Sequence, residues 1–274
     1  MRRVDLHVHT TASDGSLSPA EAVRCASEAG LCAIAVTDHD TTSGVAEALE
    51  AGVRYGVEVV PGVELSVDYE GEGVHILGYF VDPAHPVLRE LLDWVVAERE
   101  ERNEAIAAAM RADGVPVTVE ALRARRPGAV VGRPHFAQAL VEHGAAVSVR
   151  DAFDRFLSRG MKYYRARRYI PMDRAFEAIR AAGGKAVFAH PFQYKYNEPE
   201  LVILTRTLVE KGLRGVECVY SGYTPEQVEY LKDLAGFYGL CVTGGSDFHG
   251  AGKPEVALGG AAVPYELLEG LKAR

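Results

Sequence analysis

The sequence predicts an α/β protein, a β/α barrel that carries a helical insertion. Short apolar runs alternate with helical patterns along most of the 274 residues, and ionisable residues directly follow several of the runs. Between residues 86 and 168 the helical patterns continue without a comparable strand. This alternation is typical of folds with parallel strands, which place their sites at the carboxyl ends of those strands.

Seven apolar runs are expected to form strands. The first, the second and the last three have the character of buried parallel strands, because they are apolar throughout. The third and fourth are separated by a short Glu-Gly-Glu-Gly turn at residues 70–73, so a local hairpin is expected there. The runs are Val4–Val8, Cys32–Thr37, Val57–Ser66, Val74–Phe80, Ala186–Ala189, Gly215–Val219 and Leu240–Gly244.

Two helices have clear starting signals. Residues 18–21 read Ser-Pro-Ala-Glu, a capping box with proline at the first helical position, and they predict a helix to about Ala29. Residues 224–227 read Thr-Pro-Glu-Gln and repeat the pattern before Val228–Tyr238. Gly30 and Gly239 follow as carboxyl-terminal stops.

The middle of the chain differs from both ends. Leu88–Asp113 is predicted as one long charged helix, and Arg133–His143 and Ser148–Ser158 as two more. The sequence therefore predicts a barrel domain of residues 1–85 and 169–274 and a helical insertion domain of residues 86–168.

Composition and charge limit the classes of function. Hydrophobic residues make up 48% and charged residues 25%, which is ordinary for a globular protein. The net charge of −8 argues against a protein that grips long duplex nucleic acid, but not against a small phosphorylated substrate. No apolar run is long enough for a signal peptide or a membrane span, so no membrane partner is expected. Four cysteines without a C-x-x-C pair are expected to be reduced core residues of a cytoplasmic protein: Cys25, Cys32, Cys218 and Cys241.

Two clusters near the amino terminus suggest metal ligands. His7 and His9 are two residues apart in a predicted strand, so both side chains point to the same face, and Asp14 follows in a polar loop. His39 lies in the ionisable run at residues 38–40, directly after the second strand; such residues beside a core need partners or a metal. The alternative is a polar loop in which Asp40 or Thr41 is the N-cap of a helix.

Single ionisable residues mark the other strands. Glu64 lies between two apolar residues and could bridge two metal ions, or it could be an outward-facing strand residue. His190 ends the fifth strand, and Asp247 and His249 repeat the spacing of two after the seventh. His75 and His135, each taken alone, are more typical of structural histidines.

The set is more informative than its members. Imidazoles with carboxylates suit zinc, manganese or iron, and about nine candidate ligands exceed the four of a structural zinc site, so two or three divalent ions per chain are expected. No G-x-S-x-G or Walker A motif and no plausible cysteine nucleophile are present, so the attacking group is expected to be a metal-bound hydroxide. His85 and His143 are assigned structural roles. Seven of the nine histidines belong to the set: His7, His9, His39, His75, His135, His190 and His249.

These motifs together resemble the PHP (polymerase and histidinol phosphatase) family, and most closely its small stand-alone phosphoesterases. The resemblance covers nearly the whole chain. It rests on Asp5-Leu6-His7-Val8-His9-Thr10, Thr37-Asp38-His39-Asp40, Pro61-Gly62-Val63-Glu64, Gly132-Arg133-Pro134-His135, Ala189-His190-Pro191 and Ser246-Asp247-Phe248-His249.

The resemblance implies a distorted (β/α)7 barrel with up to three metal ions at the strand ends. His190 would be a further ligand or the general acid, and with Asp247 it is the expected catalytic residue. By the family pattern, one ion would be bound by His7, His9, Glu64 and Asp247, a second by Asp14, His39 and His249, and a third by Glu64, His75 and His135.

The resemblance also implies a substrate class, with one departure. The branch is known for nucleoside 3′,5′-bisphosphate phosphatases, so a small, doubly phosphorylated nucleotide or sugar is expected, and the insertion would cover the site and select it. The branch tends to have arginine where this chain has Gln193, which gives weight to a phosphodiesterase acting on a cyclic phosphate or on short RNA. A non-catalytic PHP module and a metal-dependent deaminase or amidase are the remote alternatives. The expected substrate-binding cations are Arg133, Lys162, Arg165 and Lys195.

Overall fold

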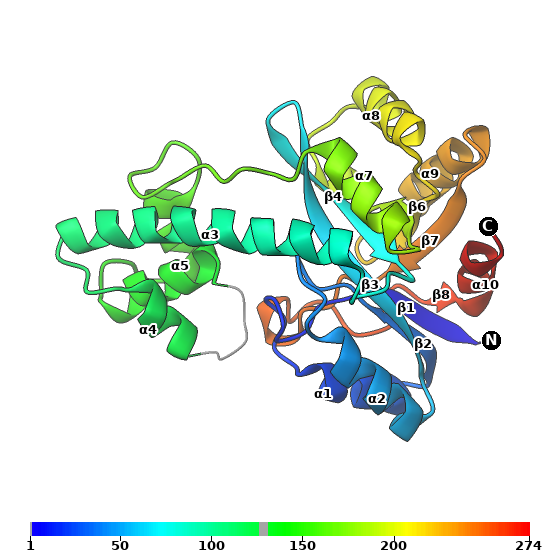
Figure 1. The fold of residues 1–274 in the computed structure, drawn as a ribbon, viewed down its shortest axis with the longest axis horizontal. Helices are drawn as coiled ribbons and strands as arrows, with labels where there is room; N and C mark the ends of the chain where they lie inside the picture. The colour runs from blue at the N-terminus through cyan, green and yellow to red at the C-terminus, as the bar shows by residue number, and fades with distance from the viewer. Residues whose placement is uncertain (1, 126–130) are drawn as a thin grey trace. The chain divides into compact units, whose positions relative to one another are not determined.

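The computed structural model describes residues 2–125 and 131–274 (Figure 1). The chain forms two compact units. The first, which we call the barrel unit, comprises Met1–Leu91 and Tyr169–Arg274, and the second, the helical unit, comprises Leu92–Arg168. Within the described residues, no helix combines the length and the apolar character needed to cross a membrane.

The barrel unit is built on one sheet with the strand order β7-β6-β5-β4-β3-β2-β1-β8. All seven predicted strands are confirmed. The additional strand, β8, has two residues and pairs antiparallel with β1; it is too short to give a sequence pattern. The strands are β1 (Arg3–Val8), β2 (Leu31–Val36), β3 (Glu58–Tyr69), β4 (Glu72–Tyr79), β5 (Lys185–Phe188), β6 (Gly215–Tyr220), β7 (Cys241–Gly245) and β8 (Val263–Pro264).

The predicted hairpin of β3 and β4 is confirmed, and it turns one strand of the barrel around. β4 pairs antiparallel with both β3 and β5, whereas β1–β2, β2–β3, β5–β6 and β6–β7 are parallel pairs. The beginning of β4 therefore lies at the edge where the parallel strands end. This reversal brings His75, opposite Ser66, to that edge although it lies early in its strand.

The sheet closes where β7 meets β1. The His9 N–H donates to the Phe248 carbonyl (2.9 Å), and the Phe248 N–H donates to the His7 carbonyl (3.3 Å). A Cβ atom on Gly245 would lie 2.3 Å from the His7 Cβ, so only glycine allows this close approach. The predicted distorted (β/α)7 barrel is confirmed, with β1–β7 as its ring.

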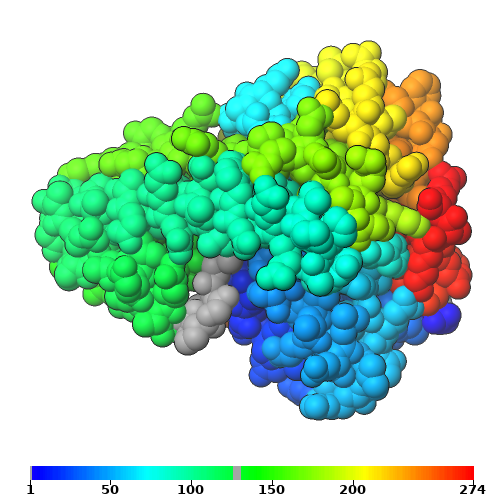
Figure 2. Space-filling view, viewed as in Figure 1, coloured from blue at the N-terminus to red at the C-terminus, as the bar shows by residue number. Residues whose placement is uncertain are grey.

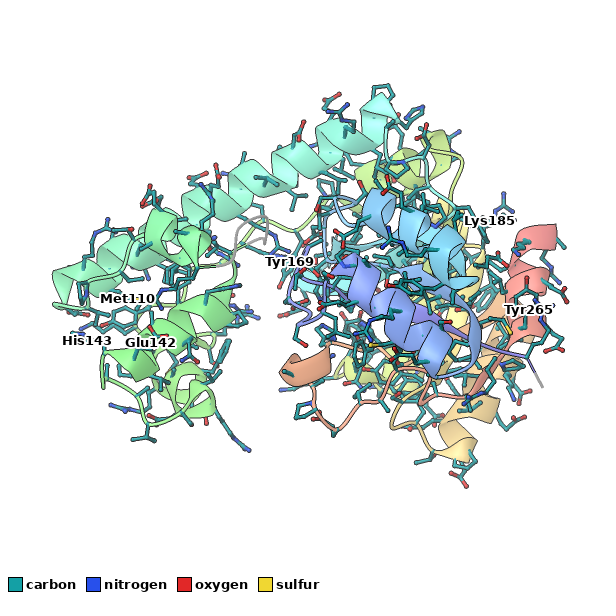
Figure 3. The ribbon with its side chains drawn as sticks, turned by 90° about the horizontal axis from the view of Figure 1, so that it is seen from below. Met110, Glu142, His143, Tyr169, Lys185 and Tyr265 are labelled. Carbon is teal, nitrogen blue, oxygen red and sulfur yellow. The ribbon has the colours of Figure 1, made fainter. Side chains whose placement is uncertain are left out.

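Helices cover the outside of the ring. The capping boxes predicted at Ser18 and Thr224 are confirmed: each side chain accepts the backbone N–H three residues on, from Glu21 and Gln227. Figure 3 shows α1 and α2 side by side across the strands, and Figure 2 shows them as a continuous blue surface. The helices are α1 (Pro19–Glu28), α2 (Val45–Tyr55), α7 (Met172–Ala181), α8 (Glu198–Lys211), α9 (Pro225–Phe237) and α10 (Tyr265–Ala273).

The idea that Asp40 caps a helix is wrong. Helix α2 starts at Val45 with Gly44 as its cap. Asp40 instead is buried in a left-handed backbone conformation (φ 53°), and its carboxylate accepts hydrogen bonds from the Ser66 N–H (2.8 Å) and hydroxyl (3.1 Å). It joins the loop after β2 to β3.

The helical unit has its own apolar core, in which Met110, Phe136 and Leu140 are fully buried; Figure 3 labels Met110. No strand occurs among its described residues. The long helix α3 (Pro86–Ala112) matches the predicted one, but the segment predicted as Ser148–Ser158 divides into an α-helical and a π-helical turn. The remaining elements are α4 (Val119–Ala124), α5 (Arg133–Glu142), α6 (Val149–Ala152) and the π-helix η1 (Phe153–Leu157).

Candidate metal centre

Glu64 lies at the centre of the polar cluster in the barrel unit. Its side chain is fully buried, so the idea of an outward-facing residue is wrong. Five imidazoles surround the carboxylate. Oε1 lies 2.9 Å from His75 Nδ1 and from His190 Nε2, and Oε2 lies 3.0 Å from His39 Nδ1, 3.2 Å from His9 Nε2 and 3.3 Å from His7 Nε2.

Two further carboxylates extend the cluster on the β1 and β7 side. Asp247 Oδ1 lies 3.2 Å from His9 Nε2 and 3.6 Å from His7 Nε2. Asp14 Oδ1 lies 3.4 Å from His249 Nε2. Ligand atoms within 4.8 Å of one another form four overlapping groups: His9, Asp14, His39 and His249; His7, Glu64 and His190; His7, His9 and Asp247; and His39, Glu64 and His75.

The buried donor atoms fit divalent cations. Within the described residues, His7 Nε2, His9 Nε2 and Glu64 Oε2 are buried and make no hydrogen bond. Leaving such atoms without partners is costly, and nitrogen and carboxylate oxygen are the donors that zinc, manganese and iron prefer. The group geometry and the donor chemistry thus suit metal ions, and overlapping groups suit more than one.

The electrostatics of the cluster favour charged side chains. Burial raises the pKa of the Glu64 carboxyl, but His39, His75 and His7 outweigh it and hold this pKa well below its usual value. Burial lowers the pKa of His9, but the close, negatively charged Asp247 and Glu64 carboxylates raise it to about 10. Protons and metal ions would therefore compete for the same nitrogens.

Two of the cluster residues have a strained backbone. His190 has φ 30° and Asp247 has φ 59°, in the left-handed region that residues other than glycine rarely adopt. Strain of this kind gathers at functional sites, where the surrounding structure enforces it. The His190 N–H donates to Glu217 Oε2 (2.8 Å), which anchors this turn.

Sequence reasoning missed Glu217, which supports two of the cluster histidines. The side chain is fully buried in β6, and its Oε1 lies 3.0 Å from His7 Nδ1. A carboxylate on this nitrogen fixes the orientation of the ring and directs its Nε2 toward Glu64. The signal was available, because Glu217 interrupts an apolar run just as Glu64 does.

Two aspartates that carry no predicted role hold the loops of the site. Asp5 accepts hydrogen bonds from the N–H groups of Ser246 (2.8 Å) and Gly259 (2.7 Å). Asp38 accepts them from the Thr10 N–H (2.7 Å) and the Ser13 hydroxyl (2.6 Å). Both link segments that are distant in the chain, so they brace the turns that present the histidines.

A pocket of ≈160 Å³ opens beside the cluster. Tyr220, the last residue of β6, and Lys253, from the loop after β7, line it, and both contact Asp247 Oδ2, at 2.8 Å and 2.6 Å. Sequence reasoning named neither. The pocket is lined by His39, His75, His190, Gln193, Tyr220, Asp247 and Lys253.

The other predicted site residues have different surroundings. In the helical unit, Arg133 and His135 begin α5, Lys162 pairs with Asp113 (2.7 Å), and Arg165 donates to the Tyr164 carbonyl (2.8 Å). In the barrel unit, Lys195 is exposed. The four ligand groups come wholly from the barrel unit and include neither His85 nor His143. The roles proposed for His135 and for these cations stay predictions.

The chain matches known proteins over most of its length. Residues 5–124 match the PHP domain model. The 5′-3′ exoribonuclease Rnm of Escherichia coli is 36% identical over 247 residues, which is 89% of this chain and 84% of that protein. The 3′,5′-nucleoside bisphosphate phosphatase of Chromobacterium violaceum is 34% identical over 254 residues, 92% of this chain and 89% of that protein.

A solved structure extends the match to the fold. A candidate metal-dependent phosphoesterase from Bifidobacterium adolescentis superimposes with a TM-score of 0.87 at 31% identity. The alignment covers 99% of this chain and 96% of that one. The barrel and the helical segment between its strands are therefore shared with a protein of similar sequence.

Proposed function

This chain belongs to the PHP domain family and is a metal-dependent phosphoesterase; from that premise we propose that it hydrolyses a phosphate ester of a small, doubly phosphorylated nucleotide or sugar. The favoured substrate is a nucleoside 3′,5′-bisphosphate, from which the enzyme would remove the 3′-phosphate. The single observation that carries the proposal is the buried Glu64 carboxylate with five imidazoles around it, beside a pocket large enough for a phosphoryl group.

We assign the metal ligands by the contacts within the cluster. These residues would hold two or three divalent ions, of manganese, zinc or iron, which would supply activation of water and neutralisation of phosphoryl charge. Glu64 is the proposed shared ligand because its carboxylate contacts histidines in or next to four strands, β1, β2, β4 and β5. The remaining proposed ligands within the cluster are His7, His9, Asp14, His39, His75, Asp247 and His249. His135 is proposed from the family pattern alone.

His190 is proposed to act at the leaving oxygen. Its ring lines the pocket, and Nε2 lies 2.9 Å from Glu64 Oε1, which suits either a ligand or a proton donor. Two phosphate esters whose leaving groups differ in their need for a proton distinguish these two roles. If His190 donates the proton, His190→Gln should slow an alkyl phosphate far more than p-nitrophenyl phosphate, whose leaving group needs no proton. Equal slowing of both esters would make His190 a ligand.

The proposal is tested by phosphate release from adenosine 3′,5′-bisphosphate with added Mn²⁺, against a chelator-treated control. We expect release that the chelator abolishes. Folded, metal-loaded protein that releases no phosphate from this compound would contradict the proposed substrate.

A second candidate is 5′-3′ trimming of short RNA. The similarity to the exoribonuclease of E. coli favours it, as does Gln193, which lines the pocket without supplying a charge. A 5′-phosphorylated RNA of about five nucleotides, compared with its 5′-hydroxyl form, would distinguish this activity from monoester hydrolysis.

The four free cysteines agree with the proposed cytoplasmic location.

A further inference from the structure

We propose that Lys253 binds the phosphoryl oxygens of the substrate in the pocket of the barrel unit. The inference rests on the proposed function, because it concerns the same site. It adds a substrate-binding residue from the loop after β7. The positive charge that contacts the phosphoryl oxygens is then beside Asp247 and not at Lys195.

A positive side chain beside the Asp247 carboxylate would favour phosphate binding, and Lys253 supplies one. Among the residues that line the pocket, Lys253 is the one lysine or arginine. The walls otherwise carry imidazoles, a phenol, an amide and the Asp247 carboxylate. A phosphoryl group that enters beside a carboxylate is repelled unless a cation neutralises it, and a lysine ammonium binds phosphate as a compact charge.

The backbone before Lys253 is held in place, and the lysine side chain is partly exposed. The short 3-10 turn Gly250–Gly252 precedes it, and this turn is fixed by the Ser16 hydroxyl, which accepts the Ala251 N–H (2.8 Å). The lysine side chain is 37% exposed, and its Nζ lies 2.6 Å from Asp247 Oδ2. The ammonium can therefore turn toward a ligand in the pocket without a change in the loop.

Asp247 uses its two oxygens for different tasks. Oδ1 faces His7 and His9, whereas Oδ2 accepts hydrogen bonds from both Lys253 and the Tyr220 hydroxyl (2.8 Å). If Lys253 moves to a phosphoryl oxygen, Tyr220 still holds Asp247 in place. Oδ2 thus has one charged partner, the Lys253 ammonium, and one neutral partner, the Tyr220 hydroxyl, and the charged partner would attract an anion more strongly.

The position of Gln193 agrees with this division. Gln193 lines the same pocket but brings no charge, and Lys195 is not among the lining residues. Lys253, on the loop after β7, therefore supplies the positive charge that the Gln193 position lacks.

The experiment measures binding of inorganic phosphate to the Mn²⁺-loaded full chain by calorimetry, and Mn²⁺ affinity by titration, for three variants and for Lys253→Arg, which keeps the charge. Lys253→Met removes the charge and keeps the stem. Tyr220→Phe is the matched control, because it removes the other hydrogen bond to the same oxygen. Lys232→Met, a lysine on α9 outside the pocket, controls for a general loss of positive charge.

We expect Lys253→Met to weaken phosphate binding roughly 10- to 100-fold, as for the loss of one charged hydrogen bond. Tyr220→Phe should change Mn²⁺ affinity more than phosphate affinity, and Lys253→Arg should restore most phosphate binding. Unchanged phosphate binding in Lys253→Met, or an equal loss in Tyr220→Phe, would overturn the inference and leave Lys253 as a support for Asp247. Lys253→Gln replaces the methionine variant if that variant does not fold.

The readout separates this inference from the proposed function. Phosphate binding that depends on Lys253 would support the anion site even if adenosine 3′,5′-bisphosphate is not a substrate. Hydrolysis of that compound by wild-type protein, with phosphate binding indifferent to Lys253, would support the function and reject the inference.

Discussion

The barrel unit and the helical unit carry their ionisable side chains in opposite ways. In the barrel, Glu64 and Glu217 are fully buried; five imidazoles contact Glu64, and the His7 ring contacts Glu217. In the helical unit, the pairs of Lys162 with Asp113 and of Arg123 with Glu100 lie largely at the surface. Burying a charge costs several kcal/mol without compensation, whereas an exposed ion pair contributes roughly 0–1 kcal/mol. A cluster of buried charges around shared imidazoles is therefore the stronger indication of function, and an exposed ion pair indicates little.

The largest expected effect follows from removing the central carboxylate. Glu64→Gln keeps the shape of the side chain but removes its charge, and we expect turnover to fall roughly 10³-fold or more, because several kcal/mol of charge stabilisation in the transition state are lost with the ions. Metal content by elemental analysis should fall as well. A Glu64→Gln variant with full metal content and wild-type turnover would remove the central argument for the barrel site.

The second effect concerns Glu217, a buried carboxylate that is not itself proposed to contact the substrate. Glu217→Gln should reduce metal affinity roughly 10- to 100-fold, the usual cost of losing a partner that orients a ligating histidine. The Co²⁺ absorption spectrum should also change, because the orientation of His7 changes. Glu210→Gln, at an exposed position on α8, is the matched control. If both variants bind metal like the wild type, Glu217 only fills space.

The two glutamates also show how far sequence reasoning reached. Both interrupt apolar strands, but only Glu64 belonged to a recognised motif, so Glu217 was passed over as part of its strand. The hairpin could be predicted from its turn, but not the consequence that β4 runs backwards and delivers His75 to the site. Lys253 could not be found, because it follows an irregular loop whose path depends on the hydrogen bond from Ala251 to Ser16.

The third effect is on the pH dependence of stability and tests whether the barrel cluster is built for cations. Although burial opposes it, contact with Asp247 and Glu64 raises the pKa of metal-free His9 to about 10. The stabilisation from protonated His9 is fully present below its unfolded pKa of about 6.5 and is lost as pH rises toward 10.

Chelator-treated protein should therefore melt at lower temperature as pH rises from about 6.5 to 9. Added metal should stabilise more over the same range, because binding requires the unprotonated ring. Thermal melts with and without Mn²⁺ measure both trends. A metal-free melting temperature that rises across this interval would contradict the assignment.

The smallest effect is expected in the helical unit, and it sharpens the comparison from the other side. Lys162→Met removes an exposed ammonium whose partner is Asp113, so stability should fall by no more than about 1 kcal/mol. If Lys162 also binds a second phosphate of the substrate, KM for a bisphosphate should rise several-fold while KM for a monophosphate and kcat for both stay constant. Equal KM changes for both substrates would show no such contact.

The control is Asp113→Asn, which removes the charge that pairs with Lys162 but keeps an oxygen that can accept the Tyr163 hydroxyl. It therefore separates loss of the ion pair from loss of the lysine. The two variants should share the stability change, and only the lysine variant should discriminate between the substrates.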